Sequence, residues 1–199
     1  MTAQTHETGG AAGAKVKEGI CSIITGTHRV EREVVELVRR TVCDTLRGGG
    51  ELTGEGIRVS RDVLTGAISA AEEIGIGVAS TTHKAAKGII LGVHDVGGDI
   101  GIAALETVKA GVHGAARVGA DVAMVAKGCA DGILEATREI GGNVFEVARI
   151  VTEGAVKSAE SVGMTAIQTV TAIVEGIAGS AREIVGAPPA AKEPTAGER

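Results

Sequence analysis

The sequence predicts an all-α protein built from tandem 22-residue amphipathic helical repeats, two 11-residue units each, arranged as an oligomeric helical array or tube. Three observations support this fold class. Apolar residues recur at helical spacing, and a 22-residue repeat accounts for residues 55–186 in six units without gaps. A glycine followed by a residue that can start a helix recurs with the same 22-residue period. Periods of this length are typical of repeat architectures.

The 11-residue half-repeat specifies the helices, because eleven residues match three turns at about 3.67 residues per turn. The second, third, sixth, ninth and tenth places of each eleven form one apolar arc, while most charges, such as Arg138 and Glu139, lie opposite. This arc is our candidate site, predicted to pack against helices or to face lipid. Its members are Ile89, Val93, Val96, Ile100, Ala104, Val122, Ala126, Ile133, Ile140, Val144 and Val151.

Glycine indicates where the helices end. Glycine recurs every 22 residues, and a residue that can start a helix follows two places later: Gly75, Gly97, Gly119, Gly141 and Gly163 precede Gly77, Asp99, Asp121, Asn143 and Thr165. Glycine favours the left-handed C-terminal position, and Asp, Asn, Thr or Gly the N-cap. We expect helices of about 20 residues, roughly 30 Å long, with tight turns. One long, glycine-softened helix on a lipid surface has the same periodicity, but the repeated stop and start signals favour the broken form.

Each glycine inside a predicted helix lowers the stability of the helix by about 1 kcal/mol relative to alanine, so another interaction must offset this loss. The pairs Gly88–Gly92, Gly97–Gly101 and Gly128–Gly132 have the four-residue spacing that lets helix backbones approach closely. Apolar residues also extend onto the polar flank of the middle repeats, at Leu91, Ile102, Leu105 and Met124. We therefore expect the helices to pack together and with other copies, or to meet lipid.

The ends of the chain differ from the repeats. Residues 1–18 are predicted to form a flexible tail. Residues 19–54 are predicted to contain an amphipathic helix over 28–46, which serves partner binding or oligomerisation, and then the glycine-rich linker "RGGGELTGEG". The six repeats occupy residues 55–186. Residues 187–199 contain prolines that cannot continue a helix, and they are predicted to be disordered.

Composition excludes several function classes. One Phe, no Trp or Tyr, and a net charge of −5 argue against nucleic-acid binding. The N-terminus lacks signal-peptide character, and the longest stretch without charge, residues 161–174, is shorter than the roughly 20 residues that a transmembrane helix needs. We expect a cytoplasmic protein, free or peripherally bound to the cytoplasmic membrane. Cys21, Cys43 and Cys129 are expected to be reduced thiols, buried or half-buried.

Catalytic and cofactor signatures are also missing from the sequence. The glycine-rich stretches do not form a dinucleotide or phosphate-binding motif. His83 and His94 lie about 16 Å apart on one helix, too far to ligate one metal, so we interpret them as solvated residues. We expect no enzymatic activity, no cofactor and no metal.

Two resemblances suggest functions. "KVKEGI" (residues 15–20) and "TAIVEGIAGSA" (171–181) resemble the 11-residue lipid-binding repeats of synucleins, and the doubled units are similar to those of apolipoproteins. The chain lacks the lysine-flanked face of the former and the proline punctuation of the latter. Residues 66–75 and 131–144 resemble the scaffold subunit of large bacterial uptake nickel-iron hydrogenases. That resemblance, over residues 55–186, implies an N-terminal segment that gathers hydrogenase copies and a helical part that forms an apolar quinone conduit near the membrane.

These observations leave three hypotheses. The first is a non-enzymatic scaffold that forms homo-oligomers, contacts a lipid such as a quinone through its apolar face, and tethers a partner enzyme through its N-terminal region. The second is a lipid-coating or stress-protection protein, similar to phasins or late-embryogenesis proteins, which would fold on a lipid surface. The third is a purely structural filament.

Overall fold

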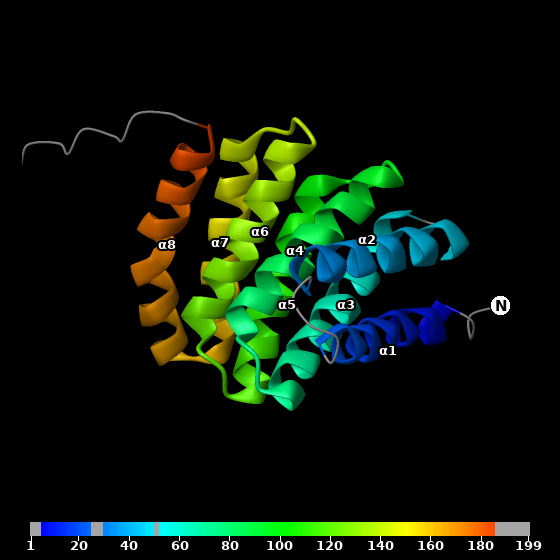
Figure 1. Ribbon diagram of the computed structural model, residues 1–199. Coiled ribbons are helices and arrows are strands. Elements are labelled where there is room, and N and C mark those ends of the chain that lie inside the picture. The colour runs from blue at the N-terminus through cyan, green and yellow to red at the C-terminus, as the bar shows by residue number, and fades with distance from the viewer. Residues whose placement is uncertain (1–4, 25–29, 50–51, 186–199) are drawn as a thin grey trace, which may run out of the picture.

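The computed structural model describes residues 5–24, 30–49 and 52–185, and these residues form helices without any strand (Figure 1). The all-α prediction is therefore confirmed. Each of the six 22-residue units contains one helix, α3 to α8, and two helices precede them. The helices are α1 (Thr5–Ile24), α2 (Val30–Gly49), α3 (Leu52–Ile74), α4 (Val78–Asp95), α5 (Ile100–Val118), α6 (Val122–Glu139), α7 (Val144–Val162) and α8 (Met164–Val185).

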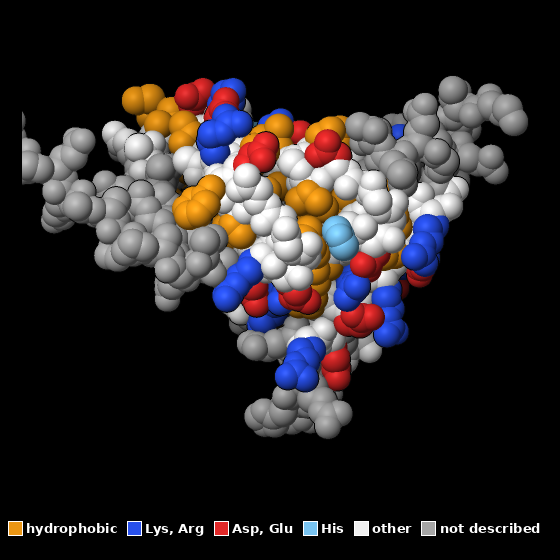
Figure 2. All heavy atoms as spheres, turned by 90° about the horizontal axis from the view of Figure 1, so that it is seen from above, with side chains coloured by type: hydrophobic (Ala, Val, Ile, Leu, Met, Phe, Trp, Pro, Cys, Tyr) orange, Lys and Arg blue, Asp and Glu red, His pale blue; other side chains and the backbone are white. Residues whose placement is uncertain are grey.

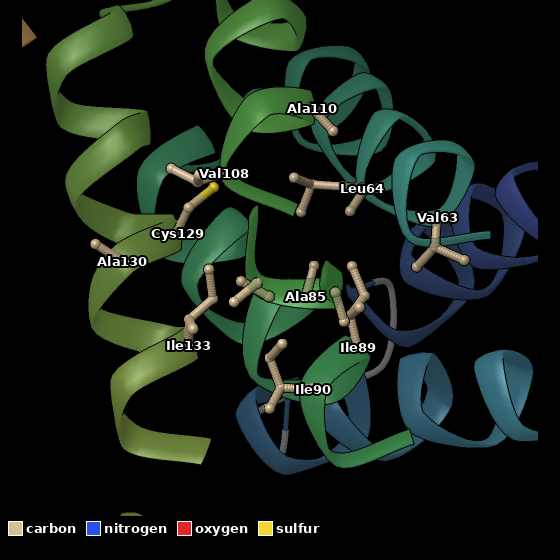
Figure 3. Close-up of a cluster of buried hydrophobic side chains, with 14 of the residues drawn as sticks. Val63, Leu64, Ala85, Ile89, Ile90, Val108, Ala110, Cys129, Ala130 and Ile133 are labelled. Carbon is tan, nitrogen blue, oxygen red and sulfur yellow. The ribbon is translucent and has the colours of Figure 1, made fainter. Parts of the chain in front are cut away.

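The helices form a two-layered array. The odd-numbered helices contact one another in order in one layer, and the even-numbered helices do so in the other. Each helix also contacts its neighbours in the sequence across the layers, so that the chain zigzags along the array (Figure 1). The core lies between the layers, where Leu64, Ile89 and Ile133 are fully buried and point toward one another (Figure 3).

The turns confirm the broken form rather than one long helix. At the end of α5, Gly119 adopts φ of 70°, and the N–H of Ala120 donates to the carbonyl of Ala115 at 2.9 Å. This is the Schellman arrangement, in which a left-handed glycine lets the chain satisfy the last carbonyls of a helix. The same hydrogen bond follows Gly75, Gly97 and Gly141, whose φ angles are 73°, 74° and 73°.

Side-chain caps begin three of the helices, as predicted. The carboxylates of Asp99 and Asp121 accept hydrogen bonds from backbone N–H groups three residues later at 2.9 and 3.0 Å, and the Asn143 amide oxygen does so at 3.2 Å. The prediction that Thr165 starts a helix is wrong. Helix α8 begins at Met164, and the Gly163 carbonyl accepts from the Ile167 N–H at 3.1 Å, so Gly163 takes the cap position. Thr165 therefore lies within the first turn.

A second glycine series fixes the helix spacing. The twelfth place of the repeat is glycine in five of the six units: Gly66, Gly88, Gly132, Gly154 and Gly176. Each lies against the preceding helix of its own layer; a Cβ on Gly88, for example, would stand 2.7 Å from the Val35 carbonyl oxygen. The pairs Gly88–Gly92 and Gly128–Gly132 make the predicted close contacts. Gly97–Gly101 does not, because Gly97 lies in a turn with no atom near its Cβ position.

The N-terminal predictions need two corrections. Residues 5–18 are not a flexible tail: they belong to α1, whose Ala12, Val16 and Ile20 are buried. Gly13 allows this helix to pack closely, because its missing Cβ lets α1 lie against the Asp62 backbone of α3. The linker prediction is also wrong, since α2 reaches Gly49 and α3 begins at Leu52. The amphipathic helix predicted over 28–46 is α2, part of the same array. Residues 1–4 and 187–199 lie outside the described residues.

Candidate binding grooves

The eleven residues of the predicted apolar face lie inside the array. Seven are buried and four are half-buried against the same core, and they come from α4 to α7 and the turns between these helices. Of the two roles expected for this face, the structure shows packing against helices of the same chain. The buried residues are Ile89, Val93, Ala104, Ala126, Ile133, Val144 and Val151, and the half-buried ones are Val96, Ile100, Val122 and Ile140.

A groove of about 590 Å³ crosses the outer side of the even layer. We call it the charged groove; it is lined by Arg32, Val35, Glu36 and Arg39 of α2, His83, Lys84, Lys87 and Leu91 of α4, and Glu135 and Glu139 of α6. The helices beneath it are in backbone contact, because Gly88 and Gly132 lie against the carbonyls of Val35 and His83. Three helices can therefore contribute side chains to one continuous surface.

Ion pairs join the three helices across the charged groove. Lys87 Nζ lies 2.9 Å from both Glu135 Oε1 and Glu139 Oε2, and His83 Nε2 lies 2.9 Å from Glu135 Oε2. Burial alone would lower the pKa of Lys87, but hydrogen bonds to Glu139 and Glu135 outweigh it and raise that pKa. Arg39 similarly binds both carboxylate oxygens of Asp95, at 2.5 and 2.9 Å. The groove thus presents fixed charges of both signs.

A second groove, of about 540 Å³, lies where the first turns of α5 and α7 meet the end of α6. We call it the apolar groove, since Ile100, Ile102, Leu105, Ile140, Val147 and Ile150 line it, with Asp99, Asn143 and Glu146 among the polar lining residues. Figure 2 shows the edge of the array that carries the α4–α5 and α6–α7 turns. Hydrophobic side chains are exposed between charged ones on this edge. Ile102 and Leu105 are two of the apolar residues that the sequence places on the polar flank.

A cluster around Glu106 occupies the outer side of the odd layer. Glu106 Oε1 lies 2.9 Å from Lys109 Nζ and Oε2 lies 3.2 Å from Arg61 Nη2, with His113 and Arg117 further along the same surface groove of about 390 Å³. Burial raises the pKa of Glu106, but the hydrogen bonds from Lys109 and Arg61 outweigh it, and the net pKa is lowered. This carboxylate therefore stabilises the α3–α5 contact in its charged form.

The pH dependence of stability is expected to show this contribution. Because the folded pKa of Glu106 lies below its unfolded value of about 4.3, its stabilisation is complete above that value and is lost as the pH falls through the folded pKa. Glu106→Gln should cost about 2 kcal/mol near neutral pH, and less as the medium becomes more acidic. Urea unfolding of both proteins between roughly pH 6 and pH 3 measures this difference. A cost that does not change with pH would contradict the assignment.

Histidines and cysteines occupy ordinary structural positions. His83 is paired with Glu135 and His94 is exposed. Cys43 and Cys129 are buried and Cys21 is half-buried, none of the three forms a disulfide, and burial raises the pKa of Cys129. Among the described residues, no three His, Cys, Asp or Glu side chains are placed to hold a metal ion. A helix of sufficient length and hydropathy to cross a membrane is likewise not found in that part of the chain.

Sequence reasoning identified neither groove as a site. Arg32, Lys87 and Glu135 are far apart in the sequence and meet only because helices two places apart are neighbours. The sequence indicates one side of the apolar groove, because Ile102 and Leu105 are apolar residues on a polar flank, but residues of α7 form the other side.

Comparison with known proteins identifies the fold and no family. No protein-family model matches the chain, and neither does any curated protein. Among solved structures, a de novo designed helical repeat protein is similar, with 20% sequence identity, a TM-score of 0.52, and coverage of 94% of this chain and 97% of that chain. The similarity supports the helical repeat array along nearly the whole chain.

Proposed function

We propose that the protein is a non-enzymatic scaffold that binds a protein partner in the charged groove. Helical repeat arrays offer extended surfaces to which several successive helices contribute. The observation that carries the proposal is the position of this groove: it crosses α2, α4 and α6, and a partner seated there would contact the N-terminal part and the repeats together. Tethering of a partner enzyme, with a nickel-iron hydrogenase as the specific candidate, is part of the proposal.

The chemistry of the groove favours a protein partner. Its lining combines cations, carboxylates and the nearly buried side chain of Leu91, a mixture suited to a polypeptide with charges of both signs. Fixed charges contribute more to the orientation and specificity of such an interface than to its affinity. Their ion pairs with one another hold them in place before a partner arrives.

Affinity capture from the native host, comparing two charge reversals, tests this proposal. Arg32 is exposed at the groove, whereas Arg138 is exposed on α6 and is not part of its lining. We expect Arg32→Glu to reduce recovery of the captured partner at least about tenfold, corresponding to roughly 1.4 kcal/mol, and Arg138→Glu to leave it unchanged. Mass spectrometry identifies the partner, including any hydrogenase subunit. Equal recovery with Arg32→Glu, or recovery of no protein, would overturn the proposal.

The apolar groove favours a second candidate function, the binding of a lipid such as a quinone. Ile102, Leu105 and Ile150 provide an apolar wall outside the closed core, and small-molecule sites are usually concave and largely apolar. Membrane-surface coating or stress protection remains the alternative interpretation of such a surface. Titration with a soluble quinone tests this candidate. We expect the NMR chemical shifts of Ile102 and Ile150 to change as the quinone binds, and unchanged shifts would reject the candidate.

A further inference from the structure

The groove on the outer side of the odd layer carries an excess of positive charge. We call this groove, of about 390 Å³ between α3 and α5, the basic groove. Its charged and polar lining residues are Arg61 and Thr65 of α3 and Glu106, Lys109, His113 and Arg117 of α5. Among these described residues Glu106 is the one carboxylate, so the permanent cations outnumber it three to one in a chain whose net charge is −5.

The two ends of the basic groove differ in how their charges are paired. At one end, the Glu106 carboxylate accepts hydrogen bonds from Lys109 and Arg61 at 2.9 and 3.2 Å, so both cations have a partner within the chain. At the other end, His113 and Arg117 are exposed and form no ion pair with the part of the chain that the structure describes. Charge of one sign gathered in a hollow attracts ions of the opposite sign. This end of the groove is therefore suited to an anionic group from outside the chain.

The spacing of the basic residues indicates the shape of such a ligand. Lys109, His113 and Arg117 lie on successive turns of α5, so they repeat about every 6 Å along the helix axis. An extended polypeptide places every second side chain on the same side, about 6.6 Å apart. Alternate side chains of an extended segment can thus follow all three residues. A single phosphate cannot, because Lys109 and Arg117 are about 12 Å apart along the axis.

We propose that the basic groove binds an acidic segment of another protein, extended along α5, with alternate Asp or Glu side chains at His113 and Arg117. A guanidinium group binds a carboxylate through two parallel hydrogen bonds. The Glu106 carboxylate, held by Lys109 and Arg61 from neighbouring helices, is an example of the same contact within the chain.

The lining of the basic groove favours a polypeptide over other polyanions. The Thr65 hydroxyl donates to the Arg61 carbonyl at 2.8 Å, so its oxygen can accept from a backbone N–H of the bound segment. The described lining contains no aromatic side chain on which a nucleic-acid base could stack. The site goes beyond the proposed function, because the charged groove lies on the outer side of the even layer and both grooves can be occupied at once.

Fluorescence anisotropy with the full chain and a labelled peptide tests this site. A peptide of about six residues that alternates Glu with Ala spans, when extended, the roughly 17 Å from Glu106 to Arg117 along α5. We expect the wild type to bind it at low ionic strength, and to bind the peptide with Gln in place of Glu at least about tenfold more weakly. Arg117→Glu should raise the Kd of the acidic peptide at least about tenfold, because repulsion replaces attraction. Circular dichroism checks that the variant remains folded.

Arg138→Glu is the matched control, since Arg138 is an exposed arginine of α6 outside the groove lining, and it should leave the Kd unchanged. Arg32→Glu should also leave it unchanged, so loss of partner capture and loss of peptide binding are separate results. No binding of the acidic peptide by the wild type, or equal losses with Arg117→Glu and Arg138→Glu, would overturn the proposal. Displacement of the peptide by an equal concentration of inorganic phosphate, or tighter binding of a single-stranded oligonucleotide that depends on Arg117, would overturn it as well.

Discussion

Replacing Gly132 with alanine is expected to destabilise the folded chain by about 2 kcal/mol. Alanine has the better helix propensity by about 1 kcal/mol, so propensity alone predicts the opposite sign. The added Cβ, however, would overlap the backbone carbonyl of His83 on α4. A backbone atom cannot move aside as a flexible side chain can, and α4 and α6 must separate. Chemical unfolding in urea measures the change.

Gly179→Ala is the matched control for this prediction. Gly179 also lies within a helix, α8, but no atom lies within 4 Å of its Cβ position. Its replacement should therefore stabilise the chain, by up to about 1 kcal/mol. Stabilisation by both substitutions would show that α4 and α6 are not in backbone contact.

Ile133→Ala is expected to cost about 3 kcal/mol, the second large effect. Ile133 is fully buried between the layers and points toward the cluster that contains Ile89, Ile90 and Cys129 (Figure 3). Its truncation removes apolar contacts and leaves a cavity that the surrounding helices can close only in part. The loss is a large fraction of the stability of a typical domain, and thermal unfolding should detect it readily.

Met124→Ala provides the comparison for Ile133→Ala. Met124 is an apolar residue of the same helix with 55% exposure, and surface substitutions of this kind usually change stability by less than about 0.5 kcal/mol. If Ile133→Ala were as mild as Met124→Ala, the side of α6 that carries Ile133 would not face a packed core.

The helix boundaries were predictable because their determinants are local. A left-handed glycine and a side-chain cap act within a few residues, so Gly119 and Asp121 together indicate a stop and a start wherever they occur in this order. Thr165 has the right residue type for a cap, but Gly163 took that position one residue before the helix. Boundaries of this kind shift by a residue or two without any change in the fold.

The arrangement of the helices was not predictable from periodicity. The repeat defines an apolar arc on each helix, and the same arc would suit a lipid surface, a tube or a closed core. The contact between α4 and α6 depends on Gly132 meeting the His83 backbone, a match between residues 49 positions apart. The error over α1 also has a long-range cause: Gly13 serves close packing against α3, which the sequence around Gly13 does not reveal.

The grooves depend on this arrangement and could be inferred only in fragments. On its own helix, each charged residue of the charged groove resembles any other surface charge. These residues form one surface only because α2, α4 and α6 lie side by side. Ile102 and Leu105 are different, because an apolar residue on a polar flank already suggests a contact. In the structure they face a groove that α7 completes.

Hydrogen exchange in buffer without lipid tests the central claim, that the apolar arc closes on helices of the same chain. We expect strong protection of the amides in α4, α5 and α6, including Ile89 and Ile133, with little change when vesicles of mixed neutral and anionic phospholipids are added. Fast exchange throughout the lipid-free chain, with protection gained only on vesicles, would contradict it. That result would mean that the repeats fold on a lipid surface rather than on one another.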